Sequence, residues 1–389
     1  MRLFGYIFLA LAFTGCMSYH AIQGKFNRYF ESGDYQKAEQ LLSKEKKADE
    51  RRNRLLYFFN RGLLSFLQNK HEESNAFFEK AVLFYENESQ KLGTEILTNF
   101  TNPNISPYFG ESFEHMYVNY YKALNYLMLN DYDAALVECR RLTQKLNAIN
   151  DIYEGRNKFK NSAYLQWFVG MVYETVKDHN NAFVAYRNSY NLYNGDYQEF
   201  FALGAPEQLK TDLLRAAGKS GLATEFDYYE KAFGSKYVPA KSEKATAIVL
   251  WHNGLAPVKE EWSIAFTANQ SNGNLYFVNA QYGFSIPVPP DQAQNKHVQD
   301  IRMLKVAMPK YFSRIPAIKT ARVFAGNSSV NFQVAEDIGQ IAERSLQDRI
   351  AKEIGKAVLR AVVKKASEIA AREQNGDLGT VLGAVNFFT

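Results

Sequence analysis

The clearest pattern in the chain is AYLQWFVGMVYETVKDHNNAFVAYRNSYNL, residues 163–192. It predicts a helix that carries Gly170, a polar turn at Asp178-His179, and a second helix with small residues at Ala182 and Ser189. Small residues on both helices allow the two backbones to approach closely, and large residues fill the remaining interface. The stretch therefore predicts an antiparallel helix pair.

Similar pairs are expected elsewhere between residues 19 and 235. Their predicted turns lie at Ser32–Tyr35, Lys70-His71, Asn130–Tyr132 and Gly218–Gly221. The pattern resembles the tetratricopeptide repeat (TPR), with insertions expected at about residues 85–112 and 143–160. The resemblance implies a TPR-like α-solenoid over residues 16–235, with a protein-binding groove lined by the first helix of each pair. The side chains expected in the groove are Tyr117, Tyr120, Trp167, Met171 and Glu174. The alternative is that the insertions fill the groove.

Residues 236–389 have a different character, so the whole chain is expected to be α+β. A small β-rich domain is predicted for residues 236–335, with strands at Ala245–Trp251, Trp262–Ala268, Asn274–Val278, Phe284–Val288, Ala321–Ala325 and Ser329–Val334. Residues 336–389 are expected to hold a long amphipathic helix and a Gly-rich apolar tail.

The long helix carries a stripe of basic residues opposite its apolar side. The stripe consists of Arg349, Lys352, Lys356, Arg360 and Lys364. One interpretation is a solvated helix face, and the other is contact with anionic lipid headgroups or an acidic cell-wall polymer.

The N-terminus resembles a lipoprotein signal peptide. Residues 1–15 combine Arg2, an apolar run that ends at Phe13, and the small pair Thr14-Gly15 before Cys16. The resemblance implies cleavage before Cys16 and acylation (palmitate) of its thiol. Met17 after the cysteine favours an outer-membrane location on the periplasmic face, with the membrane contacted through the N-terminal lipid.

Several function classes are not favoured by composition and motifs. A net charge of +5 over 389 residues is too balanced to suggest nucleic acid, and two cysteines exclude a disulfide framework. The six histidines form no metal-binding motif, so neither metal nor cofactor is expected. The compact cluster Glu111, Glu114 and His115 is interpreted as a solvated helix start, and Cys139 as an inert core thiol. No catalytic residues are assigned.

The segments Glu111–Arg141 and Asn253–Glu261 resemble an uncharacterised family of envelope lipoproteins with tetratricopeptide-like repeats. The resemblance implies a location and a fold, without an agreed activity. The expected function is that of a non-enzymatic scaffold or regulator that binds envelope proteins. The alternative is a protein or enzyme that binds cell-wall or surface glycan through the C-terminal β-domain.

Overall fold

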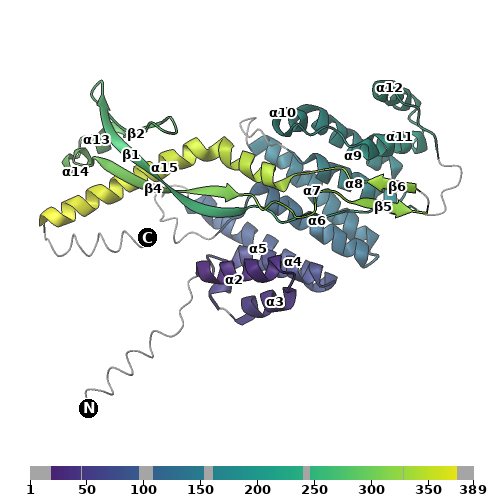
Figure 1. Cartoon of the computed structure of the whole chain (residues 1–389), viewed down its shortest axis with the longest axis horizontal. Helices are drawn as coiled ribbons and strands as arrows, with labels where there is room; N and C mark the ends of the chain where they lie inside the picture. Colours follow the sequence, from purple (N-terminus) through teal and green to yellow (C-terminus); the bar gives the residue numbers. More distant parts are fainter. Residues whose placement is uncertain are drawn as a thin grey trace, which may run out of the picture. The chain divides into compact units, whose positions relative to one another are not determined.

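The computed structural model describes residues 19–44, 46–95, 108–152, 161–239, 246–326 and 328–374 (Figure 1). These residues form helices, a small antiparallel sheet and a long C-terminal helix, which confirms the predicted α+β class. The predicted signal peptide, Cys16 and the Gly-rich tail lie outside the described residues. The chain divides into two compact units, residues 1–146 with 171–178, and residues 147–170 with 179–389.

The first unit is helical. Its elements are α2 (Tyr19–Glu31), α3 (Tyr35–Lys44), the short 3-10 turn η1 (Lys46–Asp49), α4 (Arg54–Leu67), α5 (His71–Glu95), α6 (Ser112–Met128) and most of α7 (Tyr132–Ile152). Helices α5 and α7 are longer than predicted, because they continue into the two segments expected to be insertions. No helix among the described residues of the chain is long and apolar enough to cross a bilayer.

All five predicted helix–helix turns are present and close in the same way. In each turn the residue after a left-handed residue donates its N–H to the carbonyl five positions earlier, as in a Schellman motif. The left-handed residues are Gly33, Asn69, Asn130, Lys177 and Gly221. The closing bonds run from Asp34 to Tyr29, Lys70 to Ser65, Asp131 to Tyr126, Asp178 to Tyr173, and Leu222 to Ala217. The helix pairs are therefore confirmed, while their assembly into a TPR-like solenoid stays a prediction.

Two glycines show why small residues recur in the pairs. A Cβ atom added to Gly62 would lie 2.7 Å from the ring of Phe78 on the following helix. A Cβ atom added to Gly170 would lie 2.3 Å from the ring of Tyr186. Each glycine thus provides the space that the facing aromatic ring fills.

The second unit begins with helices and continues into a sheet. Its helical elements are the first part of α8 (Ala163–Thr175), α9 (His179–Leu192), the π-type turn η2 (Tyr193–Tyr197), α10 (Gln198–Phe201), α11 (Glu207–Lys219) and α12 (Ala223–Phe233). Short helices α13 (Pro290–Ala293) and α14 (Lys296–Gln299) follow within the β-rich segment.

The main sheet has four antiparallel strands in the order β3-β2-β1-β4. Its strands are β1 (Val258–Ser271), β2 (Asn274–Asn279), β3 (Phe284–Pro287) and β4 (Met303–Phe312). The β1–β2 hairpin turns at Asn272-Gly273, as predicted, and both residues have positive φ, which suits a tight hairpin. A separate two-stranded sheet joins β5 (Arg322–Ala325) to β6 (Ser328–Asn331), which confirms the second predicted hairpin.

The long helix α15 (Ile338–Gln374) packs on the main sheet and completes its hydrophobic core (Figure 1). Its apolar stripe, with Ile354, Val358 and Val362, packs with Phe266 and Phe277 of the sheet. The predicted long amphipathic helix is therefore confirmed.

One predicted strand is absent and one observed strand was not predicted. Residues 246–251 form no ladder, and Ile248 and Val249 are exposed, because β-branched residues make a strand only where a partner edge is available. Strand β4 was not predicted at all. Its buried residues Leu304, Val306 and Met308 alternate correctly, but Pro309 and the flanking charge of Lys310 hid the pattern.

Candidate functional site

The predicted groove residues are mostly core residues. Tyr120 is fully buried, and Trp167 and Met171 are also buried, while Tyr117 and Glu174 are half-buried. The prediction that Tyr120, Trp167 and Met171 face an accessible groove is therefore wrong. Large aromatic residues in this small-and-large pattern fill the helix interfaces instead of lining a surface. Trp167 belongs to the second unit, and the other four belong to the first.

The Trp167 indole has a structural partner. Its Nε1 donates to Oδ2 of buried Asp212 at 2.8 Å, and Arg215 pairs with the other oxygen at 2.7 Å. Burial raises the pKa of Asp212, while Arg215 acts in the opposite direction. Since both carboxylate oxygens are occupied, the group connects α8 to α11 and is not available to a ligand.

A buried polar cluster in the first unit was not predicted. Lys122 on α6 contacts Glu138 of α7 at 2.8 Å and Glu79 of α5 at 2.6 Å, and its side chain is 3% exposed. Asn119 donates to Glu138 at 2.6 Å, and Lys145 donates to Asn119 at 2.7 Å. The hydrogen bond from Lys122 lowers the pKa of Glu79. The cluster joins three helices through satisfied pairs, so we assign it to structure.

The cluster at the start of α6 is more buried than expected. The backbone N–H of Glu111 donates to the Glu114 carboxylate at 2.6 Å, which forms a capping box. His115 Nε2 lies 2.6 Å from the carbonyl oxygen of Phe109, and Glu111 is buried. The structural assignment holds, but the idea of a solvated helix start is wrong for Glu111.

Two other candidates from the sequence, Cys139 and Gly218–Gly221, have structural roles. Cys139 is fully buried, and burial raises the pKa of its thiol to about 12, as expected of an inert core thiol. Gly218–Gly221 forms the turn that ends α11 and is preceded by helix, so it is not a phosphate loop.

The predicted basic stripe lies on the outer side of α15. Lys352 and Lys356 are exposed and Arg349, Arg360 and Lys364 are half-buried, whereas the apolar stripe is buried. The arrangement fits an amphipathic helix, and any contact with lipid or polymer stays a prediction.

A more unusual surface is the segment 301–335, called here the basic arm. It contains six basic residues and no aspartate or glutamate: Arg302, Lys305, Lys310, Arg314, Lys319 and Arg322. Five of them are exposed, and Arg314 is half-buried. The segment itself therefore carries one sign of charge, although exposed Glu260 on β1 lies opposite Lys310 of β4. Its excess of positive charge favours an acidic partner.

The basic arm also exposes large apolar side chains. Seven are between 43% and 82% exposed: Met303, Phe312, Ile315, Ile318, Phe324, Val330 and Val334. Single exposed apolar residues are ordinary, but seven within 32 residues of one segment make it a candidate interaction surface.

The basic arm is held in place along its length. Arg314 Nε donates to the carbonyl oxygen of Ala256 at 2.8 Å, and Asn253 Nδ2 donates to that of Ile318 at 2.8 Å. At the far end, the Tyr193 hydroxyl donates to the carbonyl oxygen of Ala335 at 2.6 Å. The exposed residues therefore sit on a backbone that is fixed at both ends.

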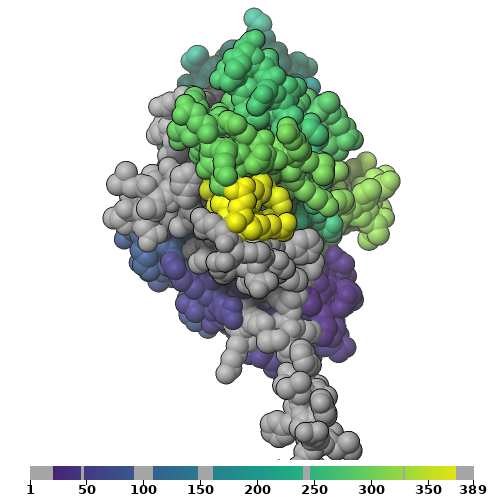
Figure 2. Space-filling view, turned by 90° about the vertical axis from the view of Figure 1, so that its left-hand side faces the viewer, coloured from purple at the N-terminus to yellow at the C-terminus, as the bar shows by residue number. Residues whose placement is uncertain are grey.

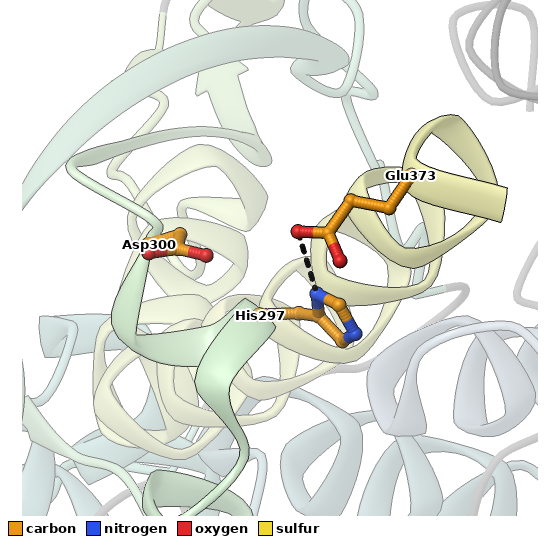
Figure 3. Close-up of side chains that lie close together, drawn as sticks. All are labelled: His297, Asp300 and Glu373. Atoms are coloured by element: carbon orange, nitrogen blue, oxygen red, sulfur yellow. Dashed lines mark ion pairs between the residues drawn. The ribbon is translucent and has the colours of Figure 1, made fainter. Parts of the chain in front are cut away.

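One group among the described residues could hold a metal ion. His297, Asp300 and Glu373 place their ligand atoms within 4.8 Å of one another (Figure 3). The sequence offered only His297-x-x-Asp300 as a local signal, because Glu373 comes from the distant end of α15.

Comparisons with known proteins add little. No family model and no curated protein matches the chain. Ten chains of known structure match, among them the crystal structure of BtubC (BKLC) from P. vanneervenii. The match to BtubC is 15% identical, with a TM-score of 0.36, and it covers 60% of this chain and 87% of that chain. This likeness is too weak to carry an argument.

Proposed function

We propose that this protein is an outer-membrane lipoprotein of the periplasmic face that acts as a scaffold or regulator by binding other envelope proteins. The sequence pattern before Cys16 supports the lipid anchor. The observation that supports protein binding is the basic arm, where six basic residues and seven exposed apolar residues occur without a single carboxylate.

The chemistry of the basic arm narrows the class of partner. Exposed Phe324 and Val330 offer apolar contact area, and nearby Lys319 and Arg322 offer positive charge. Such a combination favours an acidic protein segment with apolar side chains.

The backbone of the basic arm suggests how that segment binds. Strands β5 and β6 pair only with each other, so each has one edge without a strand among the described residues (Figure 1). Open edges can accept an added strand, and main-chain hydrogen bonds then provide affinity. The proposed mode is therefore strand addition at the β5–β6 sheet by an acidic partner.

Site-specific photo-crosslinking in cells tests the proposal. A photoreactive residue at Phe324 should give a discrete crosslinked protein, and the same residue at Tyr282, exposed elsewhere in the second unit, should not. The Lys319→Glu, Arg322→Glu variant should remove the crosslink, whereas Lys352→Glu, Lys356→Glu on α15 should keep it.

Three results would contradict the proposal. The first is a crosslink that is unchanged by the charge reversals in the basic arm. The second is loss of the crosslink only in the α15 variant, which would move binding to the basic stripe. The third is a crosslink to peptidoglycan instead of protein, which would favour the glycan-binding alternative.

A further inference from the structure

The last turn of α15 meets the short helix α14 at the edge of the second unit. The two helices are in contact, and Figure 2 shows the yellow end of α15 at the surface, bordered by the green β-rich segment. Val298 and Ile301, on and just after α14, are buried in the core that α15 shares with the sheet. Their polar neighbours in the chain, His297 and Asp300, are thereby held near Glu373.

These three polar groups converge. His297 Nδ1 lies 3.7 Å from Glu373 Oε1, and the Asp300 carboxylate faces the same space (Figure 3). Two ligands of a first-row divalent ion, each about 2.1 Å from the metal, lie roughly 3.4 Å apart in a tetrahedral site. The His297–Glu373 distance already fits this spacing. All three ligand atoms lie within 4.8 Å of one another, so a small rotation of the Asp300 side chain would bring its carboxylate to the same spacing.

The imidazole nitrogen is also unsatisfied. Nδ1 of His297 is shielded from solvent and has no hydrogen-bond partner in the described part of the chain. A buried polar atom without a partner costs free energy unless a ligand or ion satisfies it. The 3.7 Å distance to Glu373 is too long for a hydrogen bond, but it leaves room for an ion between the two atoms.

Lys296 neutralises the Glu373 carboxylate in the absence of a metal ion. Its Nζ contacts Glu373 Oε2 at 2.8 Å, which leaves Oε1 directed at His297. A divalent ion would have to compete with the Lys296 ammonium for the same carboxylate.

We propose that His297, Asp300 and Glu373 bind one first-row divalent cation, with zinc as the favoured ion. One imidazole nitrogen and two carboxylates suit zinc better than magnesium or calcium, which prefer oxygen ligands alone. The ion fixes the end of α15 to α14 across 76 residues of chain, and three protein ligands leave a fourth position for water or an external group.

Calorimetric titration of the full-length protein with zinc chloride tests the proposal, with magnesium and calcium chloride as comparison salts. One zinc ion per chain should bind, and zinc should raise Tm. Cobalt(II) should give the visible absorption of a protein-bound ion. Replacing one ligand, as in His297→Ala or Glu373→Gln, should weaken binding by at least about tenfold, since even outer partners of metal ligands contribute that much.

Two further variants make the test specific. Lys296→Met should strengthen zinc binding, because it removes the competing ammonium. His179→Gln should leave it unchanged, since His179 Nδ1 is also buried without a partner but belongs to no such ligand group among the described residues. Equal binding of magnesium and zinc, or zinc binding that survives both ligand substitutions, would overturn the proposal. So would weaker binding in Lys296→Met.

Discussion

The hydroxyl of Tyr197 donates a hydrogen bond to Oε1 of Glu336, which lies 139 residues later in the chain. The same carboxylate oxygen accepts a second bond from Ser162 Oγ at 2.7 Å, and Ser162 in turn accepts the N–H of Leu165 at the start of α8. Glu336 therefore connects the helices of the second unit to the residues that lead into α15.

Removing the Tyr197 hydroxyl should destabilise the second unit. In Tyr197→Phe, the half-buried carboxylate of Glu336 loses the hydrogen bond from the tyrosine hydroxyl, and the expected cost is about 1–3 kcal/mol. Denaturant unfolding, followed by hydrogen exchange in η2 and the first turns of α15, measures it. Tyr228→Phe is the matched control, because Tyr228 is 65% exposed on α12 of the same unit. Equal stability of the two variants would contradict the role assigned to Glu336.

Local signals account for most of what the sequence could predict. The turns at Asn130 and Gly221 combine residues that tolerate left-handed backbone with flanking helical periodicity, so the helix pairs were recognisable. The hairpin at Asn272-Gly273 was recognisable for the same reason. Each of these features depends on a few adjacent residues.

Features that depend on distant partners were missed. Strand β4 becomes a strand because Leu304 and Phe266 meet in the ladder with β1, and its own composition is ambiguous. The groove prediction failed at Tyr120 because periodicity identifies a helix face but not whether that face is covered. The ligand group at His297 was missed because Glu373 reaches it only after α15 packs on the sheet.

Acid should weaken the first unit through His115. Burial lowers the pKa of His115 to about 4, although its hydrogen bond to Phe109 acts in the opposite direction. Between pH 6.5 and 4 the unfolded chain therefore binds a proton that the folded chain does not. The contribution of neutral His115 to the free energy of unfolding is fully present above pH 6.5. It falls as the pH drops and is lost, at a cost of roughly 3 kcal/mol, once the pH is below 4.

Hydrogen exchange of the α6 amides at pH 7 and pH 5 isolates this effect. Carboxylates with lowered pKa values, such as Glu79 and Glu88, lose their contribution mainly below about pH 4.5, so they contribute little in this window. The His115→Gln variant keeps a donor for the Phe109 carbonyl but cannot be charged. It should lose less protection on acidification than the wild type. An identical loss in both proteins would show that His115 does not control this pH dependence.

Two glycines of the second unit should respond in opposite directions to alanine. Gly170→Ala places a methyl group 2.3 Å from the ring of Tyr186, which is fully buried and cannot move away without disturbing the interface. Overpacking of this kind costs about 1–3 kcal/mol. In contrast, Gly355 lies inside α15 with no atom within 4 Å of a new Cβ atom, so Gly355→Ala should gain about 0.5–1 kcal/mol of helix propensity. Thermal unfolding should therefore show a lower Tm for Gly170→Ala and a higher one for Gly355→Ala. A higher Tm for both variants would show that the α8–α9 interface accepts the methyl group, and that close approach does not explain the glycine at position 170.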